Sequence, residues 1–299
     1  MFNGILNVYK ESGYTSNDVV ARLRGILRQK KIGHAGTLDP AAVGVLPVLL
    51  GNATRLSEYI MDHDKTYRAG LLLGVVTDTQ DMTGTVISRC ESDLPGEEAV
   101  AEAVMSFVGE YEQLPPMYSA RQINGKRLYE LAREGKVVER KKSTVVIKNI
   151  VIESMELPVV KFSVDCSKGT YIRTLCHDIG QKLGCGGTLC ELTRTRAGGF
   201  LADDAITLDR ISELAGDGRI GDWIIPVEEM FLDCLRVRVP SVPSEKKLMN
   251  GNPLALSELS LPPYGAGDMI RLCRSDGEFA AVYRYEPEKG RYVPYRMFI

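Results

Sequence analysis

The residues best placed to do chemistry lie in one short segment, Gly33–Pro40, which reads GHAGTLDP and carries an imidazole and a carboxylate five positions apart. Its glycines allow backbone bends that other residues resist, and the proline restricts Asp39 to an extended or turn conformation. A carboxylate held on such a loop can act as a nucleophile or a base. The alternative is an Asx turn, in which Asp39 accepts hydrogen bonds from nearby backbone N–H groups.

Two further segments carry an aromatic or cationic side chain at an element boundary. Tyr67, in the DKTYR segment Asp64–Arg68, begins an expected strand. It is either a packed sheet residue or a stacking platform with a polar tip. Tyr171 and Arg173 lie in Gly169–Thr174, GTYIRT, where a strand gives way to a helix. A cation in the first helical turn is unfavourable, so Arg173 is either exposed or paired with a carboxylate.

Several other chemistries lack support in the chain. The segment 72–84 is rich in turn-forming residues and predicts a hairpin turn, because it has neither EF-hand nor P-loop spacing. No GxGxxG, HExxH or GxSxG motif occurs. The seven cysteines form no CxxC pair, which is typical of reduced thiols in the cytosol, and three histidines make a zinc site unexpected.

The charge is unevenly distributed along the chain. The 299 residues have a net charge of −2, which as an average argues against a nucleic-acid partner. By segment, however, residues 2–36 carry net +4, residues 37–120 net −9 and residues 121–148 net +6. Two basic stretches in an acidic background leave a local site for a polyanion possible. The apolar runs are too short to span a bilayer, and the start of the chain does not resemble a signal peptide.

The elements that would position these residues alternate irregularly between strands and helices. Strands are expected at 4–9, 65–76, 144–153, 159–166 and 188–195, with helices after Thr15 and at 171–183. Hairpins between several of the strands favour an α+β fold over a doubly wound sheet. From about residue 235, short strands with Pro, Gly and Ser between them indicate a small β-rich domain.

In order and spacing, the three motifs resemble the TruB family of tRNA pseudouridine synthases. Leu192 in the segment ELTR and the residues between Gly74 and Gly84 also fit, and the resemblance covers about residues 3–225. The sequence departs from the family where Glu11 follows Lys10, a position usually occupied by proline, which puts only the local loop geometry in doubt. Segments 247–251 and 295–299 resemble a PUA-type RNA-binding domain.

The resemblance implies a role for each matched residue. Asp39 would be the nucleophile, Arg173 would pair with it and keep it ionised, and Tyr67 would stack on the uracil and shuttle a proton. Tyr171 and Leu192 would form the walls of the uracil pocket. His34 would fill the space left by the flipped base. The basic residues that would meet RNA phosphates are Arg121, Lys126, Arg127, Arg140, Lys141 and Lys142, with Arg133 and Lys136 beside them.

The same resemblance implies the architecture. A pseudouridine synthase domain with a mixed, largely antiparallel sheet flanked by helices would span residues 1–230, and a PUA-like RNA-binding domain residues 231–299. An insertion at about 117–146 would close on RNA, unless it is simply a solvated hairpin.

The expected activity is isomerisation of uridine 55 in the T loop of tRNA, without a cofactor because the same base is retained. We expect a cytoplasmic monomer with no obligatory protein partner and no membrane association. Two alternatives stay open: a synthase for another RNA, such as guide-dependent rRNA modification, and a protein that chiefly binds and folds tRNA.

Overall fold

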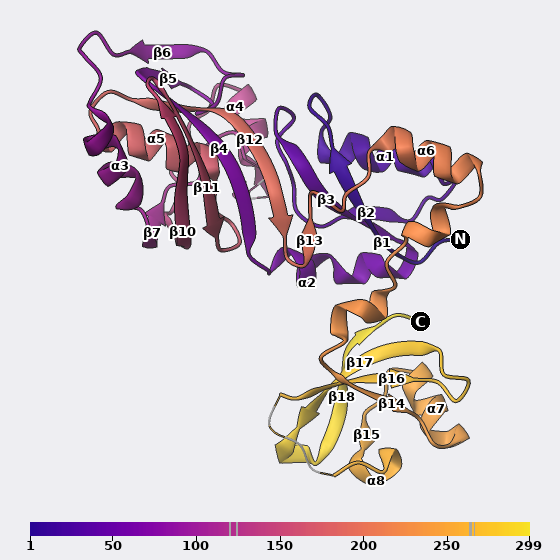
Figure 1. Cartoon of the computed structure of the whole chain (residues 1–299). Helices are drawn as coiled ribbons and strands as arrows, with labels where there is room; N and C mark the ends of the chain where they lie inside the picture. The colour runs from indigo at the N-terminus through magenta and orange to yellow at the C-terminus, as the bar shows by residue number, and fades with distance from the viewer. Residues whose placement is uncertain (120, 124, 263–264, 266) are drawn as a thin grey trace.

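A nine-stranded mixed sheet forms the larger part of the molecule (Figure 1). The computed structural model describes residues 1–119, 121–123, 125–262, 265 and 267–299. Strands run in the order β1-β3-β12-β4-β11-β10-β7, with β2 paired to β3 and β13 paired to β12. Their bounds are β1 Gly4–Lys10, β2 Ile32–His34, β3 Val43–Leu50, β4 Lys65–Leu73, β7 Gly109–Gln113, β10 Ser143–Glu156, β11 Val159–Cys166, β12 Gly187–Ala197 and β13 Phe200–Leu201.

The sheet is antiparallel except at one narrow junction. There β12 runs parallel to β3 over two residue pairs, Thr193 with Val43 and Arg194 with Gly44. Gly44 has a φ of +109°, and a Cβ at this position would lie 2.2 Å from the Arg194 carbonyl oxygen. Only glycine permits this close approach of the two backbones. The expected mixed, largely antiparallel sheet is therefore confirmed, with the parallel pairing between the second and third strands of the order.

The helices divide into two groups that cover different halves of the sheet. α1 Ser16–Ile26 and α6 Leu208–Gly216 pack over β1 and β3, whereas α3 Glu97–Met105 and α5 Ile172–Lys182 pack over β4, β10 and β11. Thr15 caps α1, since its side chain accepts from the Asp18 N–H. A short 3₁₀ turn, η1 Gly51–Leu56, leads into α2 Ser57–Met61. The two helix groups give each half of the sheet its own apolar core.

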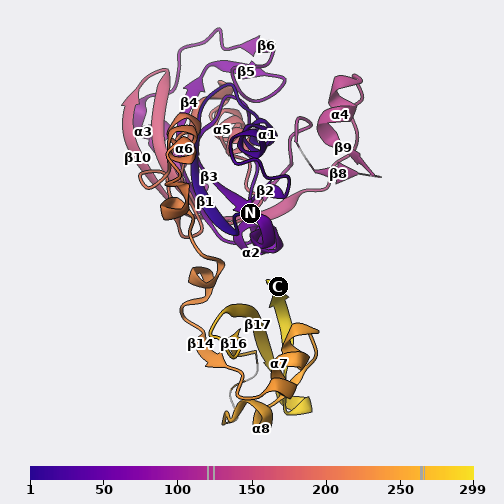
Figure 2. The same cartoon turned by 90° about the vertical axis from the view of Figure 1, so that its right-hand side faces the viewer.

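Two small hairpins project from the large sheet. One joins β5 Val75–Thr77 to β6 Val86–Arg89 across the expected turn. The other, β8 Gln122–Ile123 with β9 Lys126–Arg127, is followed by α4 Leu128–Arg133 and lies within the insertion of residues 117–146. In Figure 2 this insertion stands away from the body of the molecule.

A separate five-stranded sheet follows in the C-terminal part. Its order is β14-β16-β17-β18-β15, with bounds β14 Leu235–Arg238, β15 Leu254–Ala255, β16 Met269–Cys273, β17 Phe279–Glu286 and β18 Arg291–Met297. The sequence analysis missed two helices here, α7 Val242–Met249 and α8 Leu256–Leu259. The signal for α7 was present, because Ser241 caps it and proline occupies its first turn. The sequence analysis did not use this signal because Pro and Ser are also typical of loops.

The two parts of the chain pack directly against each other. Arg55 of η1 donates from Nη1 to the carbonyl oxygens of Met297, at 2.7 Å, and Ile299, at 2.8 Å. Phe231 and Phe298 join a core cluster that also contains residues of β1 and β3. The short coiled segments between the parts are η2 Ile220–Trp223 and η3 Val227–Phe231, and η4 Pro287–Lys289 lies in the C-terminal part. Among the described residues, no helix is long and apolar enough to cross a membrane.

The buried thiols predict how stability depends on pH. Cys176 of α5 is fully buried, and burial raises the pKa of its thiol above that of an unfolded chain. Above about pH 8.5 the unfolded chain releases a proton that the folded protein retains, so stability falls as pH rises. We expect Cys176→Ala to reduce this fall by about 1 kcal/mol per pH unit between pH 9 and 10, measured by urea unfolding under reducing conditions.

A matched control comes from the same helix and core. Ile179→Val removes buried apolar volume but no titratable group, so it should lower the free energy of unfolding equally at every pH. If the free energy of unfolding of Cys176→Ala falls with pH as steeply as that of the parent, the Cys176 thiol is not a cause of the fall.

Candidate active site

An ion pair between Asp39 and Arg173 lies at the centre of the candidate site. Arg173 Nε is 3.0 Å from Asp39 Oδ2, and Nη2 is 3.5 Å from Oδ1. The Arg173 side chain is 6% exposed, whereas that of Asp39 is 38% exposed. The cation is therefore enclosed while the carboxylate remains open to a ligand.

Three further acceptors hold the Arg173 guanidinium in place. Nη1 lies 3.4 Å from Asp81 Oδ2 and donates to the Thr79 carbonyl at 3.3 Å. Nη2 donates to the Tyr118 carbonyl at 2.8 Å. Asp81 itself accepts from the backbone N–H and hydroxyl of Thr83. The turn after β5 and the insertion thus both orient this arginine, and the turn that the sequence analysis treated as structural supplies a second carboxylate.

The start of α5 is fixed by an amide side chain from β7. Gln113 is 1% exposed; its Nε2 donates to the Tyr171 carbonyl at 2.9 Å, and its Oε1 accepts from the Tyr171 N–H at 2.7 Å. Tyr171 occupies the N-cap position, so Arg173 lies in the first helical turn. The carboxylate partner expected for a cation at this helix end is present in duplicate, as Asp39 and Asp81.

Burial makes Asp39 harder to ionise than the sequence analysis expected. Desolvation raises the pKa of the Asp39 carboxyl, and the nearby Asp81 charge adds to that rise. Arg173 and Lys10 oppose the shift. Arg173 lowers the pKa of Asp39, as expected from the sequence, but the rise in that pKa caused by burial is larger.

A cavity of about 470 Å³ opens beside the carboxylate. Tyr67, Tyr171 and Leu192, all expected to surround a base, line this one space together with Asp39 and Arg173. Burial raises the pKa of the Tyr67 hydroxyl, so it is protonated at neutral pH. The cavity therefore combines apolar and aromatic walls with a carboxylate at one side.

A second cavity of about 520 Å³ lies on the other side of Asp39. His34 lines this second space and not the first, and it lies on strand β2 rather than in the loop expected from its glycines. Burial lowers the pKa of the His34 imidazole, which favours the neutral ring. Thr15 to Asn17 at the start of α1 face Arg127, Tyr129 and Arg133 across this cavity. Residues from the 2–36 and 121–148 stretches therefore line one cavity, and its cations from these stretches, Arg127 and Arg133, come from the second.

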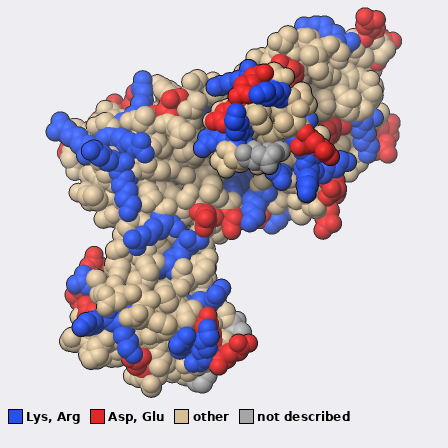
Figure 3. Space-filling model, turned by 180° about the vertical axis from the view of Figure 1, so that it is seen from behind, with Lys and Arg blue, Asp and Glu red and all other residues tan. Residues whose placement is uncertain are grey.

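The candidate phosphate-binding residues occupy different environments. Lys141 and Lys142 are exposed, and Arg127 lies over the Tyr129 ring at 5.8 Å. Lys126 pairs with Glu134 at 3.6 Å, and Arg140 donates to the Pro115 carbonyl at 2.9 Å. Arg121 donates to the Ser143 hydroxyl and lines the first cavity. Figure 3, seen from behind the view of Figure 1, shows Lys and Arg side chains spread over the surface. One group of them lies where the large sheet domain meets the C-terminal part.

The sequence analysis missed two buried cations next to the segment that carries Asp39. Lys10 is fully buried and donates to three carbonyls, including that of Pro40, the residue after Asp39, at 3.2 Å. Burial lowers the pKa of its ammonium to about 8. Arg194 is 1% exposed and donates to the carbonyls of Gly36 and Thr37. Their acceptors are main-chain oxygens brought together by folding, which no local motif indicates.

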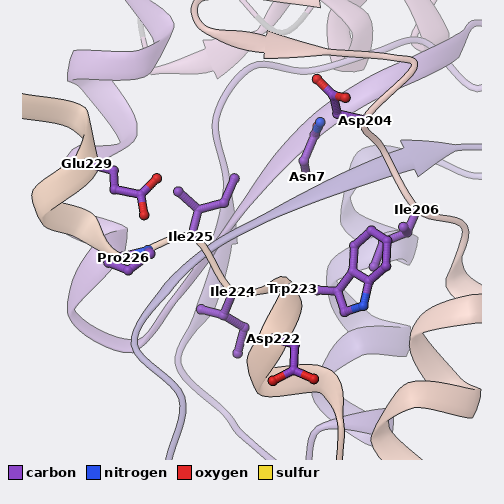
Figure 4. Close-up of a pocket in the computed structure, with 9 residues that line it drawn as sticks. All are labelled: Asn7, Asp204, Ile206, Asp222, Trp223, Ile224, Ile225, Pro226 and Glu229. Atoms are coloured by element: carbon purple, nitrogen blue, oxygen red, sulfur yellow. The ribbon is translucent and has the colours of Figure 1, made fainter.

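A third hollow of about 320 Å³ lies apart from Asp39, and Figure 4 shows its side chains. None of the expected site residues lines it. Its walls come from β1, η2, η3 and the segment before α6, and its residues are Asn7, Asp204, Ile206, Asp222, Trp223, Ile224, Ile225, Pro226 and Glu229. Within the described parts of the chain, no group of three or more His, Cys, Asp or Glu side chains is arranged to hold a metal ion.

Comparison with known families identifies the group to which this site belongs. The profile described as "TruB family pseudouridylate synthase (N terminal domain)" matches residues 24–172, and "tRNA pseudouridylate synthase B C-terminal domain" matches residues 173–232. A protein of Lachnoclostridium phytofermentans named "tRNA pseudouridine synthase B" is 46% identical over 99% of this chain and 100% of its own length. The chain belongs to the TruB family. Another relative of that name, from Clostridium novyi, is 45% identical over 93% of both chains.

Solved structures agree with this placement within the TruB family. A "Cbf5-Nop10-Gar1 Complex" is 28% identical, with a TM-score of 0.73 over 99% of this chain and 85% of that one. An "H/ACA RNP bound to a substrate RNA containing 2'-deoxyuridine" is 26% identical, with a TM-score of 0.72 over the same shares. The predicted family and fold class are confirmed.

The carboxylate pair around Arg173 predicts the acid side of the pH–rate profile. Replacing Asp81 by Asn removes a charge that raises the pKa of Asp39, so the acid limb should move to lower pH. The maximal rate should fall roughly tenfold, because Arg173 loses one charged anchor. Single-turnover pseudouridine formation between pH 5 and 8 measures both effects.

Asp78→Asn serves as the control for this experiment. Asp78 lies in the same turn but accepts from the Thr85 N–H at 2.8 Å, so its loss should leave the acid limb unmoved. An unshifted limb in Asp81→Asn would show that Asp39 is not the group that sets it.

Proposed function

We propose that this protein isomerises uridine 55 in the T loop of tRNA to pseudouridine, with Asp39 as the nucleophile. The observation that carries the proposal is Asp39, exposed to the cavity that Tyr67, Tyr171 and Leu192 line, and paired on its enclosed side with Arg173. The full-length relatives named tRNA pseudouridine synthase B support tRNA as the substrate.

The reaction moves the uracil from an N-glycosidic to a C-glycosidic bond. The target nucleotide flips out of the RNA and its base enters the cavity between Tyr67 and Leu192. The Asp39 carboxylate then acts on the ribose or on the base, the N1–C1′ bond breaks, and the uracil rotates and reattaches through C5. Tyr67, protonated and beside the base, can pass the C5 proton onward. No redox or phosphoryl step occurs, so the proposal needs no cofactor.

RNA binding is assigned to the basic surfaces around the site. His34 lines the second cavity, and we assign to it the space left in the RNA by the flipped base. The insertion of residues 117–146 contributes cations for phosphates, and the C-terminal sheet from residue 231 onward acts as a PUA-like RNA-binding domain beyond a catalytic domain of residues 1–230. We further propose a cytoplasmic monomer that works without a protein partner or a membrane.

One observation favours a second candidate. The solved structures with TM-scores above 0.7 include complexes titled H/ACA RNP and Cbf5-Nop10-Gar1, so guide-dependent modification of another RNA is the alternative. Incubating the pure protein with an unmodified tRNA transcript separates the two. Pseudouridine at position 55 without added protein or RNA supports the tRNA enzyme; its absence supports the guide-dependent reading.

The nucleophile assignment predicts a clean separation of chemistry from binding. Asp39→Asn removes the reacting carboxylate but keeps nearly the same shape, so isomerisation should fall by roughly a thousandfold or more. Affinity for tRNA should stay within a few fold, measured by filter binding beside tritium release from C5-labelled transcript. Near-normal turnover in this variant would falsify the assignment.

The insertion predicts the salt dependence of tRNA binding. Lys141→Gln with Lys142→Gln removes two exposed cations, so affinity should fall and the slope of log K against log salt should become shallower by roughly 2. Lys182→Gln, at the far end of α5 beside Phe107, is the matched control and should leave the slope unchanged. Equal slopes in the double variant and the parent would remove these residues from the RNA interface.

A further inference from the structure

Buried cations other than Arg173 lie around the first cavity: Lys65 and Arg194 line it, and Lys10 donates to the Pro40 carbonyl next to Asp39. Lys10, Lys65 and Arg194 are each less than 10% exposed. Among the residues that the structure describes, none of the three has a carboxylate oxygen within 4.0 Å, and each donates to main-chain carbonyls. Buried cations without a countercharge are costly. Such an arrangement indicates an anion that arrives with the substrate or forms during the reaction.

Arg194 is the best placed of the three cations. It lines the cavity together with Tyr67 and Leu192, and it lies at the parallel junction of β3 and β12. Nε donates to the Val45 carbonyl at 2.8 Å, and Nη2 donates to the Gly36 carbonyl at 3.2 Å. Its charge opposes the rise in the pKa of Tyr67 and helps to lower the pKa of His34. The field of Arg194 therefore reaches Tyr67 in the first cavity and His34 in the second.

The guanidinium cannot rotate away from this position. Backbone oxygens from β3 and from the Asp39 loop hold its nitrogens, and Gly44 allows β3 to lie directly against the Arg194 backbone. A charge fixed before the reaction needs no reorganisation when the substrate's charge changes.

We propose that Arg194 stabilises the negative charge that moves onto the uracil when its glycosidic bond breaks. This inference rests on the proposed function. Before the reaction, the negative charge lies on Asp39 and is paired with Arg173. When the N1–C1′ bond breaks, its electron pair leaves with the uracil, while the Asp39 carboxylate either forms an ester bond to C1′ or takes a ribose proton. In both cases Asp39 becomes neutral and the base becomes an anion.

The two arginines therefore serve the two ends of one charge transfer. Addition of Asp39 to C6 of the base also places negative charge on the ring, so the role of Arg194 is the same by each route. When C5 of the anion bonds to C1′, Asp39 is released as a carboxylate, by loss of its ester bond or by return of its proton to the ribose, and the base becomes neutral. Transfer of a proton from C5 and protonation of N1 then give pseudouridine. On the C6 route, the bond between Asp39 and C6 breaks before the product is released. The proposal assigns Arg194 to an electrostatic role, exerted through its fixed position at the cavity wall.

A change of leaving group tests this role. Fluorine at C5 withdraws electrons and stabilises a uracil anion, so a 5-fluorouridine transcript needs less help from Arg194. We expect Arg194→Gln to slow cleavage of the glycosidic bond in the uridine transcript roughly a hundredfold, and in the fluorinated one roughly tenfold or less, under single-turnover conditions. Arg194→Lys keeps the charge and should recover most of the rate.

Matched variants separate charge from structure. Arg196→Gln, two residues along β12 and paired with Asp165 at 2.9 Å, should lose no more with one substrate than with the other. If Arg194→Gln fails to fold, Arg194→Met removes the charge without burying an unpaired amide. As a second readout, the pKa of His34 measured by NMR should rise in the neutral variant.

Each outcome bears on one claim. Equal losses for both transcripts, or an Arg194→Lys variant as impaired as the neutral one, overturn the role of Arg194 while leaving the proposed function intact. Absence of pseudouridine with the parent enzyme overturns the proposed function itself.

Discussion

The geometry of the site depends on how completely the Arg173 guanidinium is held. It binds two carboxylates and two main-chain carbonyls that come from the loop after β2, the turn after β5 and the insertion. Each of these segments must fold correctly for the arginine to find its acceptors. In return, the buried Arg173 cation compensates the negative charges of Asp39 and Asp81, which would otherwise repel each other beside the first turn of α5. The ion pair and its hydrogen bonds thus join three separate loops.

The sheet provides the second constraint on the site. Cavity walls come from β4, which carries Tyr67, and β12, which carries Leu192 and Arg194. Nine residues of β12 pair with β4, whereas only two pair with β3, so the backbone pairing that joins the Asp39 side of the sheet to the wall that carries Leu192 is short. Gly44 makes that contact possible because a side chain there would collide with β12.

Local patterns in the sequence were sufficient for much of this picture. The apolar spacing predicted α1 and α5, and the motifs around Asp39, Tyr67 and Arg173 converge on one cavity. What the sequence could not reveal depends on folding. Lys10 and Arg194 bind backbone oxygens from distant segments, and the raised pKa of Asp39 follows from burial that no motif encodes. Helix α7 was missed because its proline and serine are equally typical of loops.

The narrow contact between β3 and β12 also has a mechanical meaning. The two halves of the large sheet have separate apolar cores, and the short pairing of β3 with β12 connects them (Figure 1). Asp39 lies in the half that contains β1 and β3, and Arg173 lies in the half that contains β4, β10 and β11. A bend at the contact between β3 and β12 would therefore change the distance between these two residues more than the distances within either half. A ligand that contacts both halves would therefore limit this bend and hold Asp39 and Arg173 at a fixed distance.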